Sequence, residues 1–455
     1  MAELYACVRM EAASSFLDLS VQGFDSKLLL FTEHLLSAIG EFEVDDERFG
    51  VISESLSRAY KNQTLKPQKQ ASMLRLQLLL PSAAAPQDKL AFLASAKCSA
   101  AGLRARMAQM FPSPSDWQPP LLVEGLLMGN VQRAAAERIF QALSATVALP
   151  ARGDSRHVSR PLSTRCVRLP RSCDRVLATL SDNAVEKNSA IELYYQIGAE
   201  RGADEGTSPA EGEGGVAWDS PLRMRTLSLL DLLEVLLCEA FFDELRTKQQ
   251  LGYHVEVGAR RSNGVLGLAF CIQSAVKTPP ELLERIEAFV ETIPALLKAA
   301  DFEAHKESLI ASKTEKDPSL GEEAEHHFHV IRDGRDDHWW LNREEAEDIA
   351  AVELQEVAAF AQTHLSAGGG ARRRVCVMVF GTGNADARAG ARARARAGAH
   401  ARADARAHSV ARSCSGREEA AAELAAVVAA AGDRNVRSAA TWWAEEGRDC
   451  YPCLV

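Results

Sequence analysis

Helical periodicity is clearest in residues 227–251 of the chain. Apolar side chains recur there every three to four residues and acidic residues occupy other positions, which is the pattern of an amphipathic helix. The apolar stripe consists of Leu230, Leu233, Leu237, Phe241 and Leu245. Gly252 follows the last of these positions. A glycine at this place can adopt the left-handed conformation that ends a helix, so we expect Gly252 to close it.

Alternation replaces this periodicity directly after the glycine. Residues 253–257 alternate between apolar and polar side chains, which is typical of a half-buried strand. The tripeptide Ser-Asn-Gly at 262–264 has the composition of a hairpin turn, and a second apolar strand follows at 265–272. The stretch is therefore predicted to form the end of a helix followed by a β-hairpin.

The first third of the chain mixes helical and strand patterns. In the helix at 45–61, Phe49, Ile52 and Leu56 are expected to face a core. A mixture of helices and strands of this length favours an α+β layer in which helices cover one face of a sheet. The pattern predicts strands at 16–24 and 121–129, and helices at 26–39, 45–61, 86–110 and 131–143.

The middle of the chain gives a second set of elements around the hairpin. A segment rich in Gly, Glu, Ala and Ser at 198–220 is predicted to be a flexible loop, because it can bury little apolar surface. The other elements are strands at 175–181, 190–197 and 374–380, and helices at 280–299, 301–316, 320–331 and 350–365.

Composition is that of an ordinary globular protein. The chain has 455 residues, of which 47% are hydrophobic and 25% charged, and the length favours two to four domains. No uninterrupted apolar run is long enough to span a bilayer, and the N-terminal residues lack the pattern of a secretory signal. Ten scattered cysteines favour reduced thiols over a disulfide framework, so the cytoplasm is the expected compartment.

The net charge of −10 is unevenly distributed. Residues 371–417 contain eleven arginines and two aspartates, so this stretch carries about +9 and the remainder of the chain about −19. An acidic body argues against specific binding of nucleic acid by the folded part. Residues 385–412 are nearly alternating Ala and Arg, and such a segment is predicted to be disordered.

The sequence Arg-Thr-Lys-Gln-Gln-Leu-Gly-Tyr at 246–253 closely resembles the last domain of insulin-degrading enzyme and nardilysin, which are zinc endopeptidases of the pitrilysin family. The resemblance continues through the Asn-Gly turn, the Gln-Ser strand end and the helix at 278–290, and it spans about residues 14–379. It implies the fold of pitrilysin and the mitochondrial processing peptidase: two homologous α+β domains, each an antiparallel-rich β-sheet covered by helices.

The resemblance also implies domain limits. Residues 1–150 correspond to the third (middle) domain of the insulysin-like architecture, and residues 160–381 to the fourth domain with an inserted loop at 198–220. Residues 382–455 form the Ala- and Arg-rich tail.

Two residues have catalytic counterparts in the resembling family. The matching arginine and tyrosine reach the zinc site from the C-terminal half and stabilise charge on the attacked carbonyl, which implies catalytic roles for Arg246 and Tyr253. Guanidinium and phenol groups are hydrogen-bond donors and suit this task. The structural alternative is that Arg246 is a cation favoured at a helix C-terminus and Tyr253 a half-buried strand aromatic.

The zinc motif of the family, His-x-x-Glu-His, is absent from the sequence. The pair Glu33-His34 comes closest, but Leu30 stands where the first histidine is needed. The cluster Glu325-His326-His327-Phe328-His329 lacks a strong metal-ligand spacing, and Cys450-x-x-Cys453 has no partner pair. We therefore expect no metal or cofactor in this chain and place the zinc in a partner.

The expected function is that of the C-terminal half of an insulin-degrading-enzyme-like zinc metalloendopeptidase. Its partners would be a zinc-bearing N-terminal half, in cis or in trans, and a peptide or small-protein substrate, with no specific nucleic acid and no membrane. The alternative is a catalytically inactive scaffold or peptide-binding subunit of a pitrilysin-family complex. The chain could also be a piece of a full-length enzyme, which upstream genomic sequence would reveal.

Overall fold

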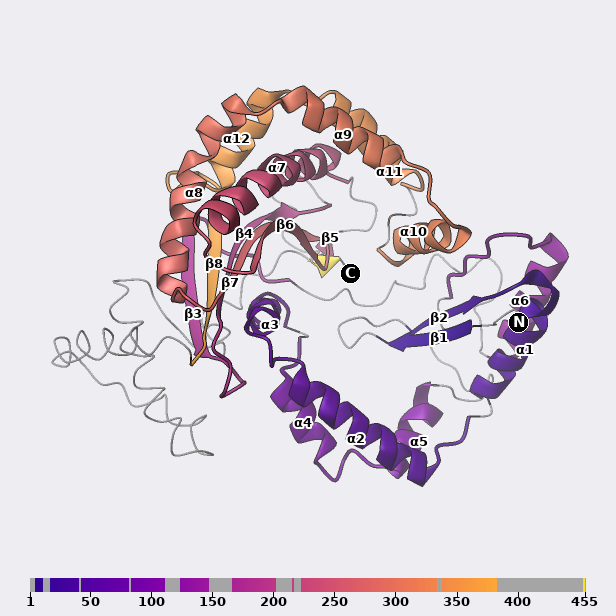
Figure 1. Ribbon diagram of the computed structural model, residues 1–455. Helices are drawn as coiled ribbons and strands as arrows, with labels where there is room; N and C mark the ends of the chain where they lie inside the picture. The colour runs from indigo at the N-terminus through magenta and orange to yellow at the C-terminus, as the bar shows by residue number, and fades with distance from the viewer. Residues whose placement is uncertain are drawn as a thin grey trace.

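The computed structural model describes residues 5–10, 17–40, 42–81, 83–110, 123–146, 166–201, 215–216, 222–333, 335, 338–382 and 453–454. Figure 1 shows these residues as a ring of elements, with the early helices at the lower right and a larger sheet unit at the upper left. Predictions for most of 198–220 and for nearly all of the tail after residue 382 lie outside the described residues.

The N-terminal unit is mainly helical in its described part. Its two strands, β1 (Tyr5–Met10) and β2 (Leu17–Gln22), form an antiparallel pair. Its helices are α1 (Asp25–Gly40), α2 (Asp46–Asn62), α4 (Pro86–Leu93), α5 (Ala100–Met110) and α6 (Arg133–Thr146).

The C-terminal unit is built on a five-stranded, mostly antiparallel sheet, as the predicted α+β class requires. The strand order is β3-β8-β4-β7-β6, with only β3 and β8 parallel. The strands are β3 (Cys173–Leu180), β4 (Ser189–Ala199), β6 (His254–Ser262), β7 (Val265–Ser274) and β8 (Arg373–Phe380). A separate short parallel pair joins β5 (Gly215–Val216) to β9 (Cys453–Leu454).

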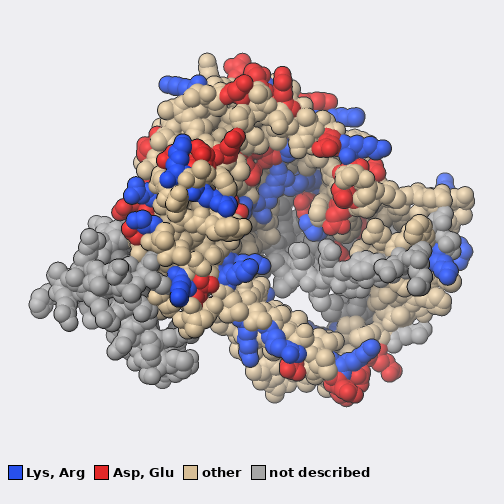
Figure 2. All heavy atoms as spheres, viewed as in Figure 1, with Lys and Arg blue, Asp and Glu red and all other residues tan. Residues whose placement is uncertain are grey.

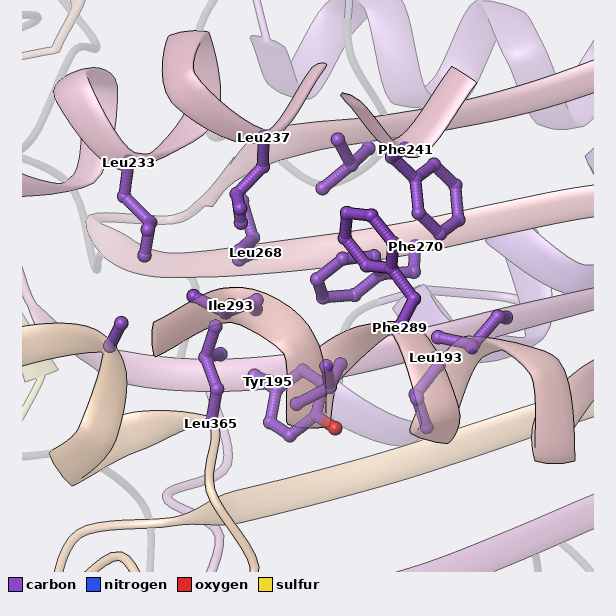
Figure 3. Close-up of a cluster of buried hydrophobic side chains, with 14 of the residues drawn as sticks. Leu193, Tyr195, Leu233, Leu237, Phe241, Leu268, Phe270, Phe289, Ile293 and Leu365 are labelled. Carbon is purple, nitrogen blue, oxygen red and sulfur yellow. The ribbon is translucent and has the colours of Figure 1, made fainter. Parts of the chain in front are cut away.

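One face of the sheet is covered by helices of the same unit. These are α7 (Met224–Phe242), α8 (Pro279–Ala299) and α12 (Leu354–His364), with α9 (Phe302–Thr314), α10 (Leu320–Arg332) and α11 (Leu341–Ala350) further along the ring in Figure 1. Figure 3 shows the core between helices and sheet, where Phe241, Phe270 and Phe289 meet edge to face at centroid distances of 5.0–6.5 Å. Tyr195 adds a fourth ring, 5.9 Å from that of Phe270.

The opposite face of the sheet is covered by α3 (Pro67–Leu79), a helix from the region matched to the middle domain. Ala71, Leu78 and Leu79 pack with residues of β4, β7 and β8 in a second apolar cluster. No element is predicted at α3, because Gln70 and Arg75 lie on its buried side and break the apolar stripe. The sheet therefore has two covers that come from distant parts of the chain.

Several predicted elements of the N-terminal unit need correction. The helix predicted at 86–110 is two helices, because residues 94–99 form turns and bends between α4 and α5. Residues 123–128, predicted as a strand, have no strand partner among the described residues. The expected core residues Ile52 and Leu56 are exposed, and α2 buries none of its side chains.

In the C-terminal unit the hairpin is confirmed. Asn263 and Gly264 both have positive φ, 50° and 71°, which is the backbone of a two-residue type I′ turn. The helix predicted at 350–365 begins only at Leu354, because residues 341–350 form the separate helix α11. Among the described residues, no helix has the length and apolar character needed to cross a bilayer.

Figure 2 shows charged side chains of both signs on this face, with Lys and Arg gathered beside the central hollow and Asp and Glu at the top.

Candidate functional site

Residues 246–253, which include both predicted site residues, lie at the junction between α7 and β6. Helix α7 ends at Phe242 and continues as a π-helical turn, η2 (Asp243–Lys248). The backbone N–H of Gln249 donates to the carbonyl of Glu244 at 3.1 Å, five residues back, as in a π-helix. Such turns are rare and occur frequently at functional sites, so the local geometry singles out this junction.

The helix does not end in the way predicted. The residue in the left-handed conformation is Gln250, with a φ of 52°, whereas Gly252 does not have a positive φ. Gly252 is required for a different reason: a Cβ at this position would lie 1.9 Å from the carbonyl oxygen of Gln273 on β7. Its missing side chain allows the chain to pass closely over β7 before β6 begins.

Both predicted site residues lie at this junction and contact each other. The guanidinium carbon of Arg246 lies 4.6 Å from the ring centroid of Tyr253 and 4.7 Å from that of Phe242. Tyr253 is 85% exposed, so it is not the half-buried aromatic of the structural alternative. Arg246 lies in the last turn of η2, as that alternative expects of a helix C-terminal cation.

Phe242 was not identified from the sequence. It precedes Arg246 by four residues in a helical segment, and this spacing brings side chains onto the same face. That spacing is the signal that could have found it.

The acidic residues of η2 are occupied by other partners. Lys248 lies 2.9 Å from Asp243 and 3.4 Å from Glu244, and Gln249 donates to Glu244 at 3.0 Å. The hydrogen bond from Gln249, followed by the interactions with Lys248, lowers the pKa of Glu244. No carboxylate of the described part of the chain lies within ion-pair distance of Arg246.

The strand that begins after Tyr253 is attached to α3. His254, the first residue of β6, hydrogen-bonds with Gln68 of α3 and lies 3.3 Å from Glu256. Glu256 in turn accepts a 2.6 Å hydrogen bond from Arg260. The position of Tyr253 thus depends on both covers of the sheet, α7 through η2 and α3 through His254.

The histidine cluster of α10 forms no metal site. His326 lies 3.6 Å from Asp317, His329 lies 3.5 Å from Glu325, and His327 stacks on Trp339 at 5.0 Å. Nowhere in the described part of the chain do three or more His, Cys, Asp or Glu side chains converge as metal ligands. Within the described ranges, the histidines of α10 therefore pair with carboxylates and an aromatic ring rather than converging on one point.

Comparison with known proteins defines the class to which these features belong. Residues 1–92 match the family model described as "middle or third domain of peptidase M16". Residues 232–328 match the one described as "PQQ synthase PqqF-like, C-terminal lobe domain 4". The chain therefore contains two segments that match domains of the M16, or pitrilysin, peptidase family, and it is similar to the C-terminal half of the insulin-degrading enzyme and nardilysin members.

Individual relatives agree with this assignment. A nardilysin-like protein of Arabidopsis thaliana is 30% identical over 374 residues, which cover 80% of this chain and 33% of the relative. Human insulin-degrading enzyme is 30% identical over 310 residues, covering 67% of this chain and 27% of the enzyme. The chain thus spans about a third or less of the length of these relatives.

Solved structures show the same fold. The crystal structure of pitrilysin matches with a TM-score of 0.64 and 17% identity over 84% of this chain and 36% of pitrilysin. A peptidase M16 inactive domain from Pseudomonas fluorescens matches with a TM-score of 0.52 and 15% identity, over 83% of this chain and 81% of that domain.

Proposed function

We propose that this chain is the C-terminal half of an insulin-degrading-enzyme-like zinc metalloendopeptidase. In this proposal it forms one wall of a closed chamber and assists hydrolysis of peptide bonds in short polypeptides. The observation that supports the proposal most directly is the contact between the half-buried Arg246 and the exposed Tyr253, in which the cation has no carboxylate partner among the described residues.

The chemistry of the pair suits acyl transfer. When a peptide carbonyl is attacked, negative charge develops on its oxygen, and hydrogen-bond donors aimed at that oxygen lower the barrier. The Arg246 guanidinium supplies up to five N–H donors in one plane, and the Tyr253 hydroxyl supplies another. Neither residue activates water, so both act on the substrate carbonyl or backbone rather than on the nucleophile.

The remaining catalytic parts must come from another polypeptide segment. We assign the zinc ion, its ligands and the general base to an N-terminal half, linked in cis or bound in trans, and the substrate is a peptide or small protein. When bound, zinc would activate the attacking water and polarise the carbonyl. The limits of the two domains, 1–150 and 160–381, and the cytoplasmic location remain predictions.

The proposal can be tested by complementation. The chain is mixed with a zinc-bearing N-terminal half, either of human insulin-degrading enzyme or encoded upstream of this chain, and cleavage of an internally quenched peptide is followed. Losing one oxyanion donor should lower kcat about a hundredfold, so Arg246→Ala and Tyr253→Phe should each show such a fall. Arg133→Ala, which changes a 92% exposed side chain on α6, serves as the matched control. Wild-type turnover in both site variants would remove their proposed role.

The alternative is a non-catalytic scaffold or peptide-binding subunit. The absence of His-x-x-Glu-His from the sequence favours it, and a solved M16 domain of similar extent is described as inactive. A stable complex with a zinc-bearing half that binds the quenched peptide without cleaving it would support this alternative and contradict the peptidase proposal.

A further inference from the structure

We infer that Phe242 is a positioning residue for Arg246: its ring holds the guanidinium against Tyr253. This inference rests on the proposed function of Arg246 but concerns a residue for which no role is assigned. The guanidinium carbon is nearly equidistant from the two ring centroids, at 4.7 Å from Phe242 and 4.6 Å from Tyr253. Both distances lie within the range of cation–π attraction.

Phe242 is not needed for the core, although its neighbour is. The ring of Phe241 is fully buried and lies 5.2 Å from Phe270 and 5.0 Å from Phe289. Phe242, the next residue, is 40% exposed. Phe242 belongs to neither apolar core cluster, and its ring contacts the guanidinium of Arg246 instead.

The π-helical turn creates this contact. It starts directly after Phe242, and the buried Leu245 fixes its orientation against the core. Arg246 then follows Phe242 within a widened turn, and Tyr253 returns to the same place after the close pass of Gly252 over β7. The backbone thus brings two aromatic rings from α7 and from the start of β6 to the same guanidinium.

Among the residues that the structure describes, no carboxylate pairs with Arg246. Its nearest acidic neighbours in sequence, Asp243 and Glu244, are paired with Lys248 at 2.9 and 3.4 Å. Stacking restrains the side chain without using its N–H groups, whereas an ion pair would occupy them. A residue that must donate to a transient oxyanion benefits from this arrangement, because its donors are oriented before the substrate arrives.

Removing the Phe242 ring should therefore change the orientation of the Arg246 side chain more than it lowers the stability of the fold. Phe242→Leu keeps an apolar side chain but deletes the π face, whereas Phe242→Tyr keeps it. In the complemented peptidase, Phe242→Leu is expected to lower kcat about three- to tenfold with little change in KM, and Phe242→Tyr is expected to retain wild-type kcat.

A spectroscopic measurement on the isolated full chain tests the contact without any partner. Protons of the Arg246 side chain, assigned by their absence in Arg246→Lys, should resonate upfield in the wild type because two rings lie beside them. The shift should decrease in Phe242→Leu and persist in Phe242→Tyr, with unfolding midpoints of both variants close to that of the wild type.

The two proposals fail in different ways. Unshifted Arg246 protons in the wild type, no change of the shift in Phe242→Leu, or equal loss of kcat in Phe242→Leu and Phe242→Tyr would each overturn the positioning role. If the upfield shift depends on Phe242 but neither Arg246→Ala nor Tyr253→Phe lowers turnover, the stacked contact stands and the catalytic proposal for Arg246 is wrong.

Discussion

The two faces of the five-stranded sheet are covered by different chemistry. Toward α7, α8 and α12 the contacts are mostly apolar, with an aromatic cluster at the centre (Figure 3), and one buried cation, Arg374 of β8, donates to Glu287 of α8 at 2.6 Å. Toward α3 the apolar cluster is smaller and includes a buried ion pair, in which Arg75 donates to Glu192 at 2.7 Å. The first face, called the apolar face below, has the larger apolar cluster. On the second, called the charged face, the buried pair Arg75–Glu192 joins α3 to β4.

This difference between the two faces of the sheet affects the candidate site, because the site is connected to α7 on one face and to α3 on the other. Arg246 follows from α7, and its position is set by the apolar face through Phe241 and Leu245. Tyr253 leads into His254, which hydrogen-bonds with Gln68 of α3. The donor pair is therefore held by two independent attachments, and each can be weakened separately.

The largest effect is expected on the charged face. Arg75→Met leaves the carboxylate of Glu192, which is 1% exposed, without its cation and should cost about 3–5 kcal/mol of unfolding free energy. The other carboxylate oxygen of Glu192 has no hydrogen-bond partner among the described residues, so it offers little compensation. Urea unfolding followed by circular dichroism measures this loss.

The double variant Arg75→Met/Glu192→Leu serves as the control for that measurement. It removes both charges and should recover most of the lost stability, because an apolar pair can replace a buried ion pair at little cost. If the single variant is as stable as the wild type, α3 is not attached through this pair and the comparison between the faces fails.

On the apolar face we expect a smaller effect. Phe270→Leu removes ring contacts with Tyr195 at 5.9 Å and Phe241 at 5.2 Å but keeps an apolar side chain, so the loss should be about 1–3 kcal/mol. The urea midpoint should fall without a change in slope. The matched control is Phe360→Leu. It changes a nearly buried ring on α12 that lies outside the Phe241–Phe270–Phe289 triad, so its loss of unfolding free energy should be smaller.

The sequence predicts one of these faces much better than the other. Helix α7 and strand β6 have clear periodicities, because each buries one side more than the other, whereas β7 is recognised by its continuous apolar run. The charged face gives no such signal. Arg75 and Glu192 are 117 residues apart and both are charged residues inside elements, which periodicity alone assigns to solvent.

For the site, the sequence supplied Arg246 and Tyr253 through a resemblance, but not their arrangement. Periodicity cannot distinguish a π-helical turn from the end of an α-helix, so neither the stacking of Arg246 on Phe242 nor the left-handed Gln250 was predicted. Gly252 was identified as a necessary glycine for the wrong reason. Its neighbour in space, the carbonyl of Gln273, is a long-range contact that local patterns do not contain.

The smallest expected effect concerns the edge strand β6, where the two faces meet. Glu234 of α7 accepts a hydrogen bond from the backbone N–H of Ala259, and burial, with a contribution from Asp231, raises the pKa of Glu234 above 4.5. The folded protein therefore binds more protons than the unfolded chain between these two pKa values. Its stability is highest below the unfolded value and falls as the pH rises through the folded one.

Glu234→Gln keeps an oxygen acceptor for Ala259 but cannot titrate, so this pH-dependent loss should disappear. The difference from the wild type should be less than about 1 kcal/mol and confined to the mildly acidic range above 4.5. Thermal unfolding at a series of pH values measures it, and Glu239→Gln, an exposed carboxylate on the same helix, controls for the change in net charge. Identical pH profiles for Glu234→Gln and the wild type would show that the edge of β6 is not held by this carboxylate, so the site would depend on η2 and His254 alone.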